Sequence, residues 1–213
     1  MKFETIFFDL DGTLYRNETG LWQAIKNRID HFLHDKMGFK WEDIPKLRQT
    51  YYKKYGTTLK GLQIHYAIDP DEYLKYTHDL PLEQYLKKDP ELHTLLKTLP
   101  QEKWVFTNSD SSHVNRVLRI VGIEDCFSGI IDINATDFYC KPDPIAFQKA
   151  FEIAHVKDLS TCVFIDDLIG NIIEAQKMGI FSIFVCGEIH QENGALHQIR
   201  HIHELKSIPV LWD

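Results

Sequence analysis

The sequence predicts an α/β fold in which a parallel sheet is covered by helices and interrupted near its start by an all-helical insertion. In the second half of the chain, short apolar segments alternate with amphipathic ones, and the connections between them are short. This alternation is typical of a parallel sheet packed between helices. Residues 18–88 break the rhythm, because a helical pattern continues throughout them. A chain of 213 residues is long enough for one such core and one insertion.

The elements of the core are predicted in order from apolar runs and from helix-end signals. Apolar runs predict strands over residues 6–8, 104–106, 130–133, 162–165 and 181–185. A helix over 114–121 stops near Gly122, where a glycine suits the helix end. A second helix begins at Asp143-Pro144, an N-cap followed by proline at the first helical position. A third, over 172–178, is closed by a glycine.

Three helices are predicted within the insertion. The first carries an apolar stripe at helical spacing, formed by Trp22, Ile25, Ile29, Phe32 and Leu33. The second contains Leu47 and Tyr51 and ends near Gly56, and the third begins at Asp69-Pro70. We therefore expect residues 1–15 and 89–213 to form the core and residues 16–88 to form the helical insertion.

Composition and charge exclude several classes of protein. Hydrophobic residues make up 44% of the chain and charged residues 26%, which is ordinary for a soluble globular protein. No apolar run approaches the roughly 20 residues that span a bilayer, so we expect neither a signal peptide nor a membrane partner. The formal net charge of −7 argues against a nucleic acid polymer as partner.

The cysteines indicate a reducing environment. They are scattered along the chain without a CxxC pair, at Cys126, Cys140, Cys162 and Cys186. This pattern favours reduced thiols over a disulfide framework or a zinc site. We expect a cytoplasmic protein that is a monomer or a weak dimer.

Polar side chains follow directly on several predicted strands. Asp9 and Asp11 follow the first strand, and two carboxylates two positions apart on one strand face can share a metal ion. Thr107-Asn108 and Asp166-Asp167 follow two further strands. Ligands bind beyond the carboxyl ends of parallel strands, so we expect these groups to converge at one sheet edge. Taken singly, Asp9 and Asp11 are also typical of a solvated turn, Thr107-Asn108 of a helix N-cap, and Lys141 of a solvated surface lysine. Two adjacent acids after a buried strand argue against a mere helix cap at Asp166-Asp167.

In their order along the chain, these residues resemble a known family. Asp9-Leu10-Asp11-Gly12-Thr13, Thr107-Asn108, Lys141-Pro142 and Asp166-Asp167 are similar to the four motifs of the haloacid dehalogenase superfamily. The resemblance implies a Rossmann-like core, covalent catalysis through an aspartate, and a helical cap of the C1 type inserted after the first motif. Asp11 is similar to the aspartate of the phosphatases and phosphomutases, since dehalogenating relatives lack it.

The resemblance also implies a role for each matching residue. Asp9 would attack phosphorus and form an aspartyl-phosphate. Asp11 would protonate the leaving oxygen and then deprotonate the water that releases phosphate. The Thr107 hydroxyl and the Asn108 backbone N–H would bind phosphoryl oxygens. Lys141 would neutralise charge on the nucleophile and on the phosphoryl group.

The implied cofactor is Mg²⁺. It would be held by the Asp9 carboxylate, the Asp11 main-chain carbonyl and Asp167, four residues before Asn171. Asp166 would be a second metal-site carboxylate that acts through water or orients the lysine. The ion would also offset the acidic charge of the chain for an anionic substrate.

The insertion has a more particular likeness. Residues 50–56, 60–62, 68–70 and 79–82 resemble the cap of the pyrimidine 5′-nucleotidase subgroup. This implies a phosphomonoester hydrolase for small molecules, with pyrimidine nucleoside 5′-monophosphates as the expected substrates. The tyrosines of this segment either stack a base or pack helices together. The alternatives are a sugar-phosphate or phosphoglycolate phosphatase, a phosphomutase of the same fold, and a non-catalytic phosphate-binding regulatory protein.

Overall fold

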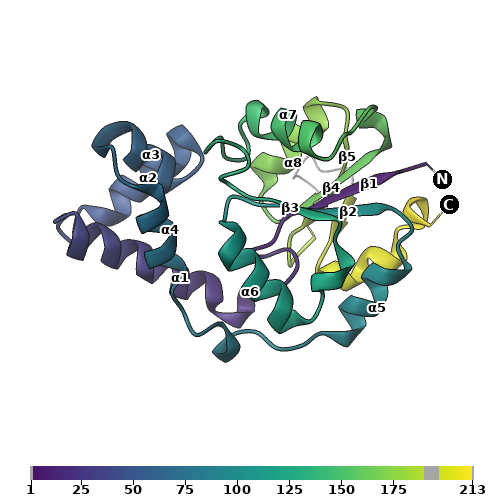
Figure 1. Cartoon of the computed structure of the whole chain (residues 1–213), viewed down its shortest axis with the longest axis horizontal. Coiled ribbons are helices and arrows are strands. Elements are labelled where there is room, and N and C mark those ends of the chain that lie inside the picture. The colour runs from purple at the N-terminus through teal and green to yellow at the C-terminus, as the bar shows by residue number, and fades with distance from the viewer. Residues whose placement is uncertain (1, 190–196, 213) are drawn as a thin grey trace. The chain divides into compact units, whose positions relative to one another are not determined.

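The structure is a computed structural model that describes residues 2–189 and 197–212 (Figure 1). The chain divides into two compact units. One consists of Met1–Asn17 and Leu86–Asp213 and is called the core unit below; the other, Glu18–Tyr85, is called the helical unit. No helix among the described residues has both the length and the apolar character that crossing a membrane requires.

The core unit is built on one six-stranded sheet in which every neighbouring pair of strands is parallel. Its strands are β1 (Thr5–Phe8), β2 (Glu102–Phe106), β3 (Gly129–Ile131), β4 (Cys162–Asp166), β5 (Phe181–Val185) and β6 (His197–Ile199). Their order in the sheet is β3-β2-β1-β4-β5-β6. Phe8, the last residue of β1, is in register with Val105 of β2 and Ile165 of β4, so the three strands end side by side. The predicted fold class is therefore confirmed.

Four α-helices cover the sheet within the described residues of the core unit: α5 (Pro90–Thr98), α6 (Ser111–Val121), α7 (Pro144–Ile153) and α8 (Ile169–Lys177). The first two lie on one face and the last two on the other (Figure 1). Short 3₁₀ helices occur at Asn17–Thr19, Leu82–Gln84, Glu124–Cys126, Leu159–Thr161, Ile202–Ser207 and Pro209–Leu211. As predicted, Asp143 caps α7, accepting a hydrogen bond from the Ile145 N–H.

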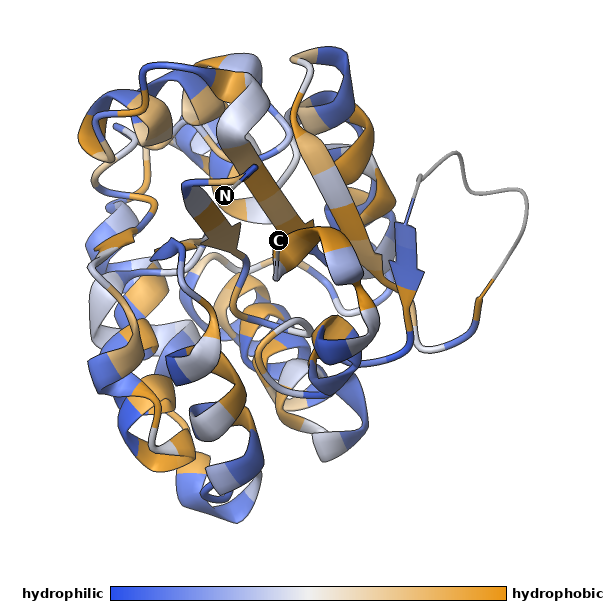
Figure 2. Cartoon of the chain, turned by 90° about the vertical axis from the view of Figure 1, so that its right-hand side faces the viewer, coloured by the Kyte–Doolittle hydropathy of each residue, from blue (hydrophilic) through white to orange (hydrophobic). Residues whose placement is uncertain are grey.

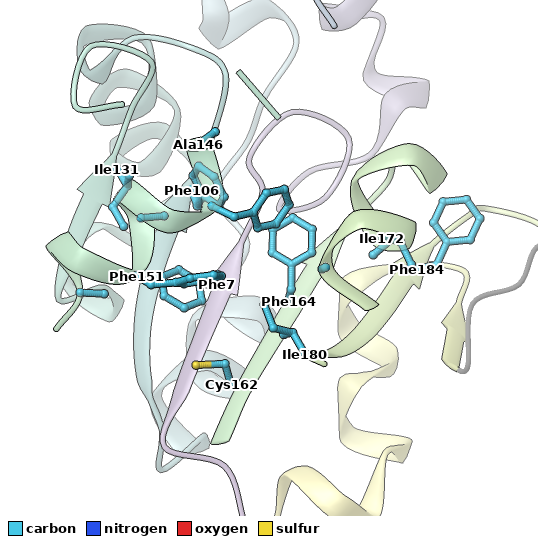
Figure 3. Packing of buried hydrophobic residues seen from close by; sticks show 14 residues of the cluster. Phe7, Phe106, Ile131, Ala146, Phe151, Cys162, Phe164, Ile172, Ile180 and Phe184 are labelled. Atoms are coloured by element: carbon cyan, nitrogen blue, oxygen red, sulfur yellow. The ribbon is translucent and has the colours of Figure 1, made fainter. Parts of the chain in front are cut away.

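The hydrophobic core explains why this sheet is stable. The strands in its middle are mainly hydrophobic, whereas the helices alternate between hydrophobic and hydrophilic residues (Figure 2). Phe7, Phe106 and Phe164 belong to one buried cluster (Figure 3). Phe147 of α7 packs against the rings of Phe106 and Phe164. The ring centroids of Phe106 and Phe147 lie 5.3 Å apart, edge to face, a favoured arrangement of aromatic rings. This packing fixes the strand ends that carry the polar side chains.

Two predicted core elements have different limits in the structure. The strand predicted over 130–133 ends at Ile131, because the Asp132 side chain accepts hydrogen bonds from the N–H groups of Ser111 and Ala135 and turns the chain away from the sheet. The last predicted helix begins at Ile169 rather than residue 172.

The helical unit contains α1 (Leu21–His31), a π-helical turn (Phe32–Lys36), α2 (Ile44–Tyr55), α3 (Thr58–Tyr66) and α4 (Pro70–His78). The prediction missed α3, which Thr57 caps by accepting a hydrogen bond from the Lys60 N–H. The prediction was also wrong in placing Trp22 on the buried stripe of α1. Trp22 is exposed, and Leu21 takes the buried position instead.

Candidate active site

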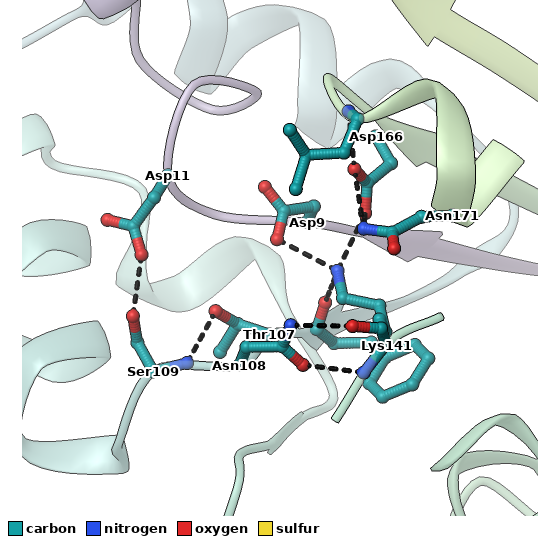
Figure 4. A network of polar contacts seen from close by, with 10 residues as sticks. Asp9, Asp11, Thr107, Asn108, Ser109, Lys141, Asp166 and Asn171 are labelled. Atoms are coloured by element: carbon teal, nitrogen blue, oxygen red, sulfur yellow. Dashed lines mark hydrogen bonds and ion pairs between the residues drawn. The ribbon is translucent and has the colours of Figure 1, made fainter. Parts of the chain in front are cut away.

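The candidate site is made by side chains at the carboxyl ends of adjacent strands of the core unit (Figure 4). Asp9 follows β1, Thr107 follows β2, and Asp166 is the last residue of β4. Because β1 lies between β2 and β4, the Asp9 side chain has neighbours from both sides. The expected convergence at one sheet edge is therefore what the geometry shows for these residues.

Lys141 lies at the centre of this group. Its ammonium Nζ is 2.8 Å from Asp9 Oδ1, 2.7 Å from Asp166 Oδ2 and 2.7 Å from the carbonyl oxygen of Phe106. The residue is only 1% exposed, so it is not a solvated surface lysine. Burial lowers the pKa of its ammonium, but the two carboxylates outweigh that effect and leave the pKa above its ordinary value. Lys141 is therefore a buried cation with all three N–H groups used.

Asn108 fixes the backbone at this lysine. The Asn108 side chain accepts a hydrogen bond from the Lys141 N–H at 2.8 Å and donates one to the Lys141 carbonyl at 3.1 Å. Thr107 is buried beside it, and its hydroxyl oxygen accepts the Ser109 N–H at 3.1 Å. An accepting hydroxyl keeps its own proton for donation, which suits the phosphate-binding role expected of Thr107.

Asp166 is wholly enclosed. One carboxylate accepts from Lys141, from the N–H of Leu168 at 2.8 Å, and from the Asn171 amide at 3.0 and 2.9 Å. Its relative exposure is 0%. Through these contacts Asp166 holds the Lys141 ammonium on one side and the Asn171 amide on the other, so Asn171 belongs to the site as a donor to Asp166.

Asp9 and Asp167 form the acidic part of the site that is suited to a cation. Carboxylate oxygens of Asp9, Asp166 and Asp167 all lie within 4.8 Å of one another. Burial raises the pKa of Asp9, with further contributions from the neighbouring carboxylates, and Lys141 only partly opposes this. Burial and the charge of Asp166 raise the pKa of Asp167 to about 7. Three close carboxylates beside one ammonium leave an excess of two negative charges, which a divalent cation would match.

Asp11 lies apart from the lysine. Its carboxylate is directed toward Ser109 and away from Asp9 (Figure 4). It accepts hydrogen bonds from Tyr15 at 2.5 Å, Ser109 at 2.6 Å and His113 at 2.9 Å. Burial alone would raise the pKa of Asp11, but His113 and the three hydrogen bonds hold it well below its usual range.

No role was predicted for these three partners of Asp11. Tyr15 and Ser109 adjoin the motif residues, and that position is the sequence signal that indicates them. His113 carries no such signal, because it lies next to the apolar stripe of α6 and a single sequence does not distinguish it from a core residue.

A second cluster with metal-ligating atoms lies elsewhere in the core unit. His93 Nε2 is 3.0 Å from Asp125 Oδ1, and the thiol of Cys126 adjoins them. Lys97 already pairs with the Asp125 carboxylate at 2.8 Å. These residues lie on α5 and on the 3₁₀ turn before β3, away from the carboxyl ends of the strands.

Comparisons with known proteins identify relatives of this chain. A model of haloacid dehalogenase-like hydrolases matches residues 3–179. Phosphate metabolism protein 8 of Saccharomyces cerevisiae is 35% identical over 233 residues, which cover 99% of this chain and 73% of the yeast protein. Pyrophosphatase PpaX of Bacillus mycoides is 24% identical, over 87% of this chain and 84% of its own length.

Solved structures show the same fold. The putative HAD-hydrolase YfnB from Bacillus subtilis, bound to magnesium, superposes with a TM-score of 0.66 at 17% identity, covering 98% of this chain and 99% of the other. A HAD phosphatase from Thermococcus onnurineus gives a TM-score of 0.64 at 19% identity, covering 97% of each chain.

Fold and site together define a hydrolase with a parallel α/β core and carboxylates at its strand ends. The chain belongs to the haloacid dehalogenase-like hydrolase family. The family resemblance inferred from the four motifs is thereby confirmed. The likeness to the pyrimidine 5′-nucleotidase subgroup and the roles of the individual site residues stay predictions.

Proposed function

We propose that this protein is a Mg²⁺-dependent phosphomonoester hydrolase that acts through an aspartyl-phosphate, with pyrimidine nucleoside 5′-monophosphates as its substrates. The observation that carries the proposal is the pairing of Asp9, at the end of the central strand β1, with the fully buried ammonium of Lys141. A carboxylate held by a buried cation at a strand end is suited to attack an anionic phosphoryl group.

The chain's own residues supply the chemistry in two halves. In the first, an Asp9 oxygen forms a bond to phosphorus while the bond from phosphorus to the leaving oxygen breaks. Asp11 gives that leaving oxygen its proton. In the second, Asp11 takes a proton from water as the water oxygen attacks phosphorus, releasing phosphate and the free Asp9 carboxylate. Lys141 offsets negative charge in both halves, because its two carboxylate partners keep it protonated.

The donor set suits Mg²⁺. The residues that would hold the ion are Asp9 and Asp167 through their carboxylates and Asp11 through its main-chain carbonyl, with Asp166 behind them. Burial, together with neighbouring carboxylates, raises the pKa values of Asp9 and Asp167, and a cation between them would favour their charged forms. When bound, the ion supplies the charge that allows an anionic carboxylate and an anionic phosphate to meet.

The choice of substrate is supported by the insertion, and the phosphatase chemistry in general by one relative. The similarity of residues 50–82 to the nucleotidase cap leads us to assign residues 16–88 as the substrate-selecting cap. The relative named for phosphate metabolism covers almost the whole chain. Within the helical unit Tyr51 is buried and stacks on His65, with ring centroids 5.4 Å apart, so it packs helices and is not assigned to the substrate. We further propose a cytoplasmic monomer or weak dimer, in keeping with four free thiols.

A phosphate-release screen tests the proposal. Purified protein with Mg²⁺ is given UMP, CMP, purine nucleoside monophosphates, sugar phosphates, phosphoglycolate and inorganic pyrophosphate. We expect the highest kcat/KM with UMP or CMP. Equal or higher values with the sugar phosphates, with phosphoglycolate or with pyrophosphate would overturn the choice of substrate, and no release from any compound would favour a non-catalytic protein.

The Asp9→Asn variant tests the covalent mechanism in the same assay. The amide is a far weaker nucleophile, so turnover should fall by about 10³-fold or more, while circular dichroism shows an unchanged fold. Substantial residual turnover with every substrate would exclude the aspartyl-phosphate.

A further inference from the structure

The cluster of metal-ligating side chains on α5 and on the 3₁₀ turn Glu124–Cys126 has the donors of a zinc site. His93 Nε2 is 3.0 Å from Asp125 Oδ1, and the Cys126 thiol sulfur is 3.8 Å from the same oxygen. The three donor atoms all lie within 4.8 Å of one another. Of the two such clusters in the part of the chain that the structure describes, this one alone mixes nitrogen, oxygen and sulfur donors. The cysteine spacing did not indicate it, because the histidine comes from 32 residues away in the sequence.

The separations of these donors are close to those around a tetrahedral zinc ion. Zinc bonds of about 2.0–2.3 Å to nitrogen, oxygen and sulfur place neighbouring ligand atoms roughly 3.3–3.7 Å apart. The observed separations of 3.0 and 3.8 Å therefore need only small adjustments. The side chains of His93 and Asp125 are 36% and 59% exposed, so they have room to rotate and solvent can reach the cluster.

Lys97 does not contact the oxygen that would hold the ion. Its ammonium lies 2.8 Å from Asp125 Oδ2 and 2.5 Å from the Asp125 main-chain carbonyl oxygen. The other carboxylate oxygen, Oδ1, is the one that faces His93 and Cys126. The lysine thus fixes the orientation of the carboxylate, as the outer-shell partners of metal ligands do.

The backbone that carries the three ligands is also fixed. Asp89 caps α5 by accepting the Leu92 N–H at 2.9 Å, and its own N–H donates to the carbonyl of Val121, the last residue of α6, at 2.9 Å. The N–H of Cys126 donates to the Ile123 carbonyl at 3.1 Å. Because these elements are held together without an ion, the ligands need little reorganisation to bind one.

We propose that His93 Nε2, Asp125 Oδ1 and the Cys126 thiolate form a Zn²⁺ site that links α5 to the turn before β3. Thiolate and imidazole favour zinc over magnesium, and three protein ligands leave a fourth position for water. Binding releases the thiol proton of Cys126 to solvent and replaces the hydrogen bond between His93 and Asp125. The ligands lie away from the carboxyl ends of the strands, so the ion stabilises the core unit and takes no part in phosphate release.

Titration with Co²⁺ tests the thiolate ligand directly. The reduced full chain is titrated in excess Mg²⁺, which occupies the carboxylates at the strand ends, with a reductant that contains no thiol. We expect the near-ultraviolet absorption of charge transfer between thiolate and Co²⁺, saturating at one Co²⁺ per chain. Cys126→Ser should abolish this absorption, whereas the control Cys186→Ser should keep it. No such absorption in the wild type, or the same absorption in Cys126→Ser, would overturn the proposal.

Isothermal titration calorimetry with Zn²⁺, again in excess Mg²⁺, tests the imidazole ligand. His93→Ala should weaken Zn²⁺ binding by about 10²-fold or more, because the loss of an outer-shell partner alone costs about 10–100-fold. His31→Ala is the matched control, since it removes a histidine that lies 3.1 Å from an aspartate outside the cluster, and it should bind Zn²⁺ as the wild type does. Equal affinities in His93→Ala and the wild type would contradict the assignment.

Thermal unfolding reports whether the ion links the two elements. Zn²⁺ should raise the Tm of the wild type and raise that of His93→Ala far less. An equal rise in both proteins would show that Zn²⁺ acts elsewhere and would overturn the proposal. Asp125→Asn takes the place of Cys126→Ser if that variant does not fold, and unchanged Zn²⁺ affinity in Asp125→Asn has the same meaning. None of these readouts is phosphate release, so failure of the proposed function leaves them unaffected.

Discussion

Gly12 serves the site because it lacks a side chain. It has φ of +98°, a backbone conformation that L side chains rarely adopt. A Cβ built there would lie 2.3 Å from Asp167 Oδ2 and 2.9 Å from Asn17 Nδ2. The turn after the first strand and the last acidic pair thus approach each other closely only because residue 12 is glycine.

Replacing Gly12 by alanine should weaken Mg²⁺ binding. The added methyl group must displace the Asp167 carboxylate, so we expect the Mg²⁺ concentration for half-maximal activity to rise by about 10–100-fold. Isothermal titration calorimetry with Mg²⁺ provides a second readout. Gly179→Ala is the matched control, since it has φ of +82° but nothing within 4 Å of the added Cβ. Equal shifts in both variants would show that backbone strain, and not the collision, is responsible.

Among individual residues, the sequence predicted the site best at positions that belong to the four motifs. Asp9, Asp166 and Asp167 were predicted to meet at the sheet edge, the family resemblance added Lys141 beside them, and the structure brings all four together. His113 was missed, because a histidine inside an apolar helix pattern shows its partner only when the fold carries it 102 residues back to Asp11. Contacts of such sequence separation are set by tertiary packing and leave no local signal.

The contact between α2 and α3 depends on one small residue. Gly61 of α3 faces the ring of Tyr51 in α2, and a Cβ at position 61 would lie 2.3 Å from Tyr51 Cγ. Gly61 is also why α3 was missed, since glycine inside a helix is unfavourable on propensity alone. The close packing of the two helices compensates for that propensity.

Gly61→Ala should therefore destabilise the helical unit, although alanine is the better helix former. Overpacking against Tyr51 should cost about 1–3 kcal/mol of unfolding free energy in this unit, seen as faster amide hydrogen exchange in α2 and α3. Gly170→Ala in α8 is the control, because its nearest contact would be Pro142 Cγ at 4.0 Å, and it should be neutral or stabilising. Slower exchange in Gly61→Ala would contradict the packing argument.

Strands were predicted well where a continuous apolar run coincides with a strand that is buried in the sheet. The strands over 104–106, 162–165 and 181–185 lie within β2, β4 and β5, since continuous apolar runs suit a sheet covered on both faces. Errors arose at element ends such as Asp132, where side-chain hydrogen bonds decide the limit and hydrophobic periodicity does not.

The whole molecule carries a formal charge of −7, and its site concentrates part of that charge. Mg²⁺ should therefore be essential for activity and dispensable for folding, since the aromatic core under α7 and α8 needs no ion. An excess of EDTA should abolish phosphate release, and added Mg²⁺ should restore it fully. Circular dichroism should show no unfolding, while Mg²⁺ should raise Tm. Full activity in excess chelator would exclude the metal assignment.

The direct pairing of β1 with β2 has a consequence for the history of such proteins. These two strands are neighbours in the sheet, yet the chain between them includes all 68 residues of Glu18–Tyr85. Every partner of β1 and β2 in the ladder belongs to the core unit, so the sheet needs no hydrogen bond from the intervening segment. Related proteins can therefore change the segment between β1 and β2 and keep the same carboxylates at the strand ends. A new substrate specificity can then arise without a change in the catalytic residues.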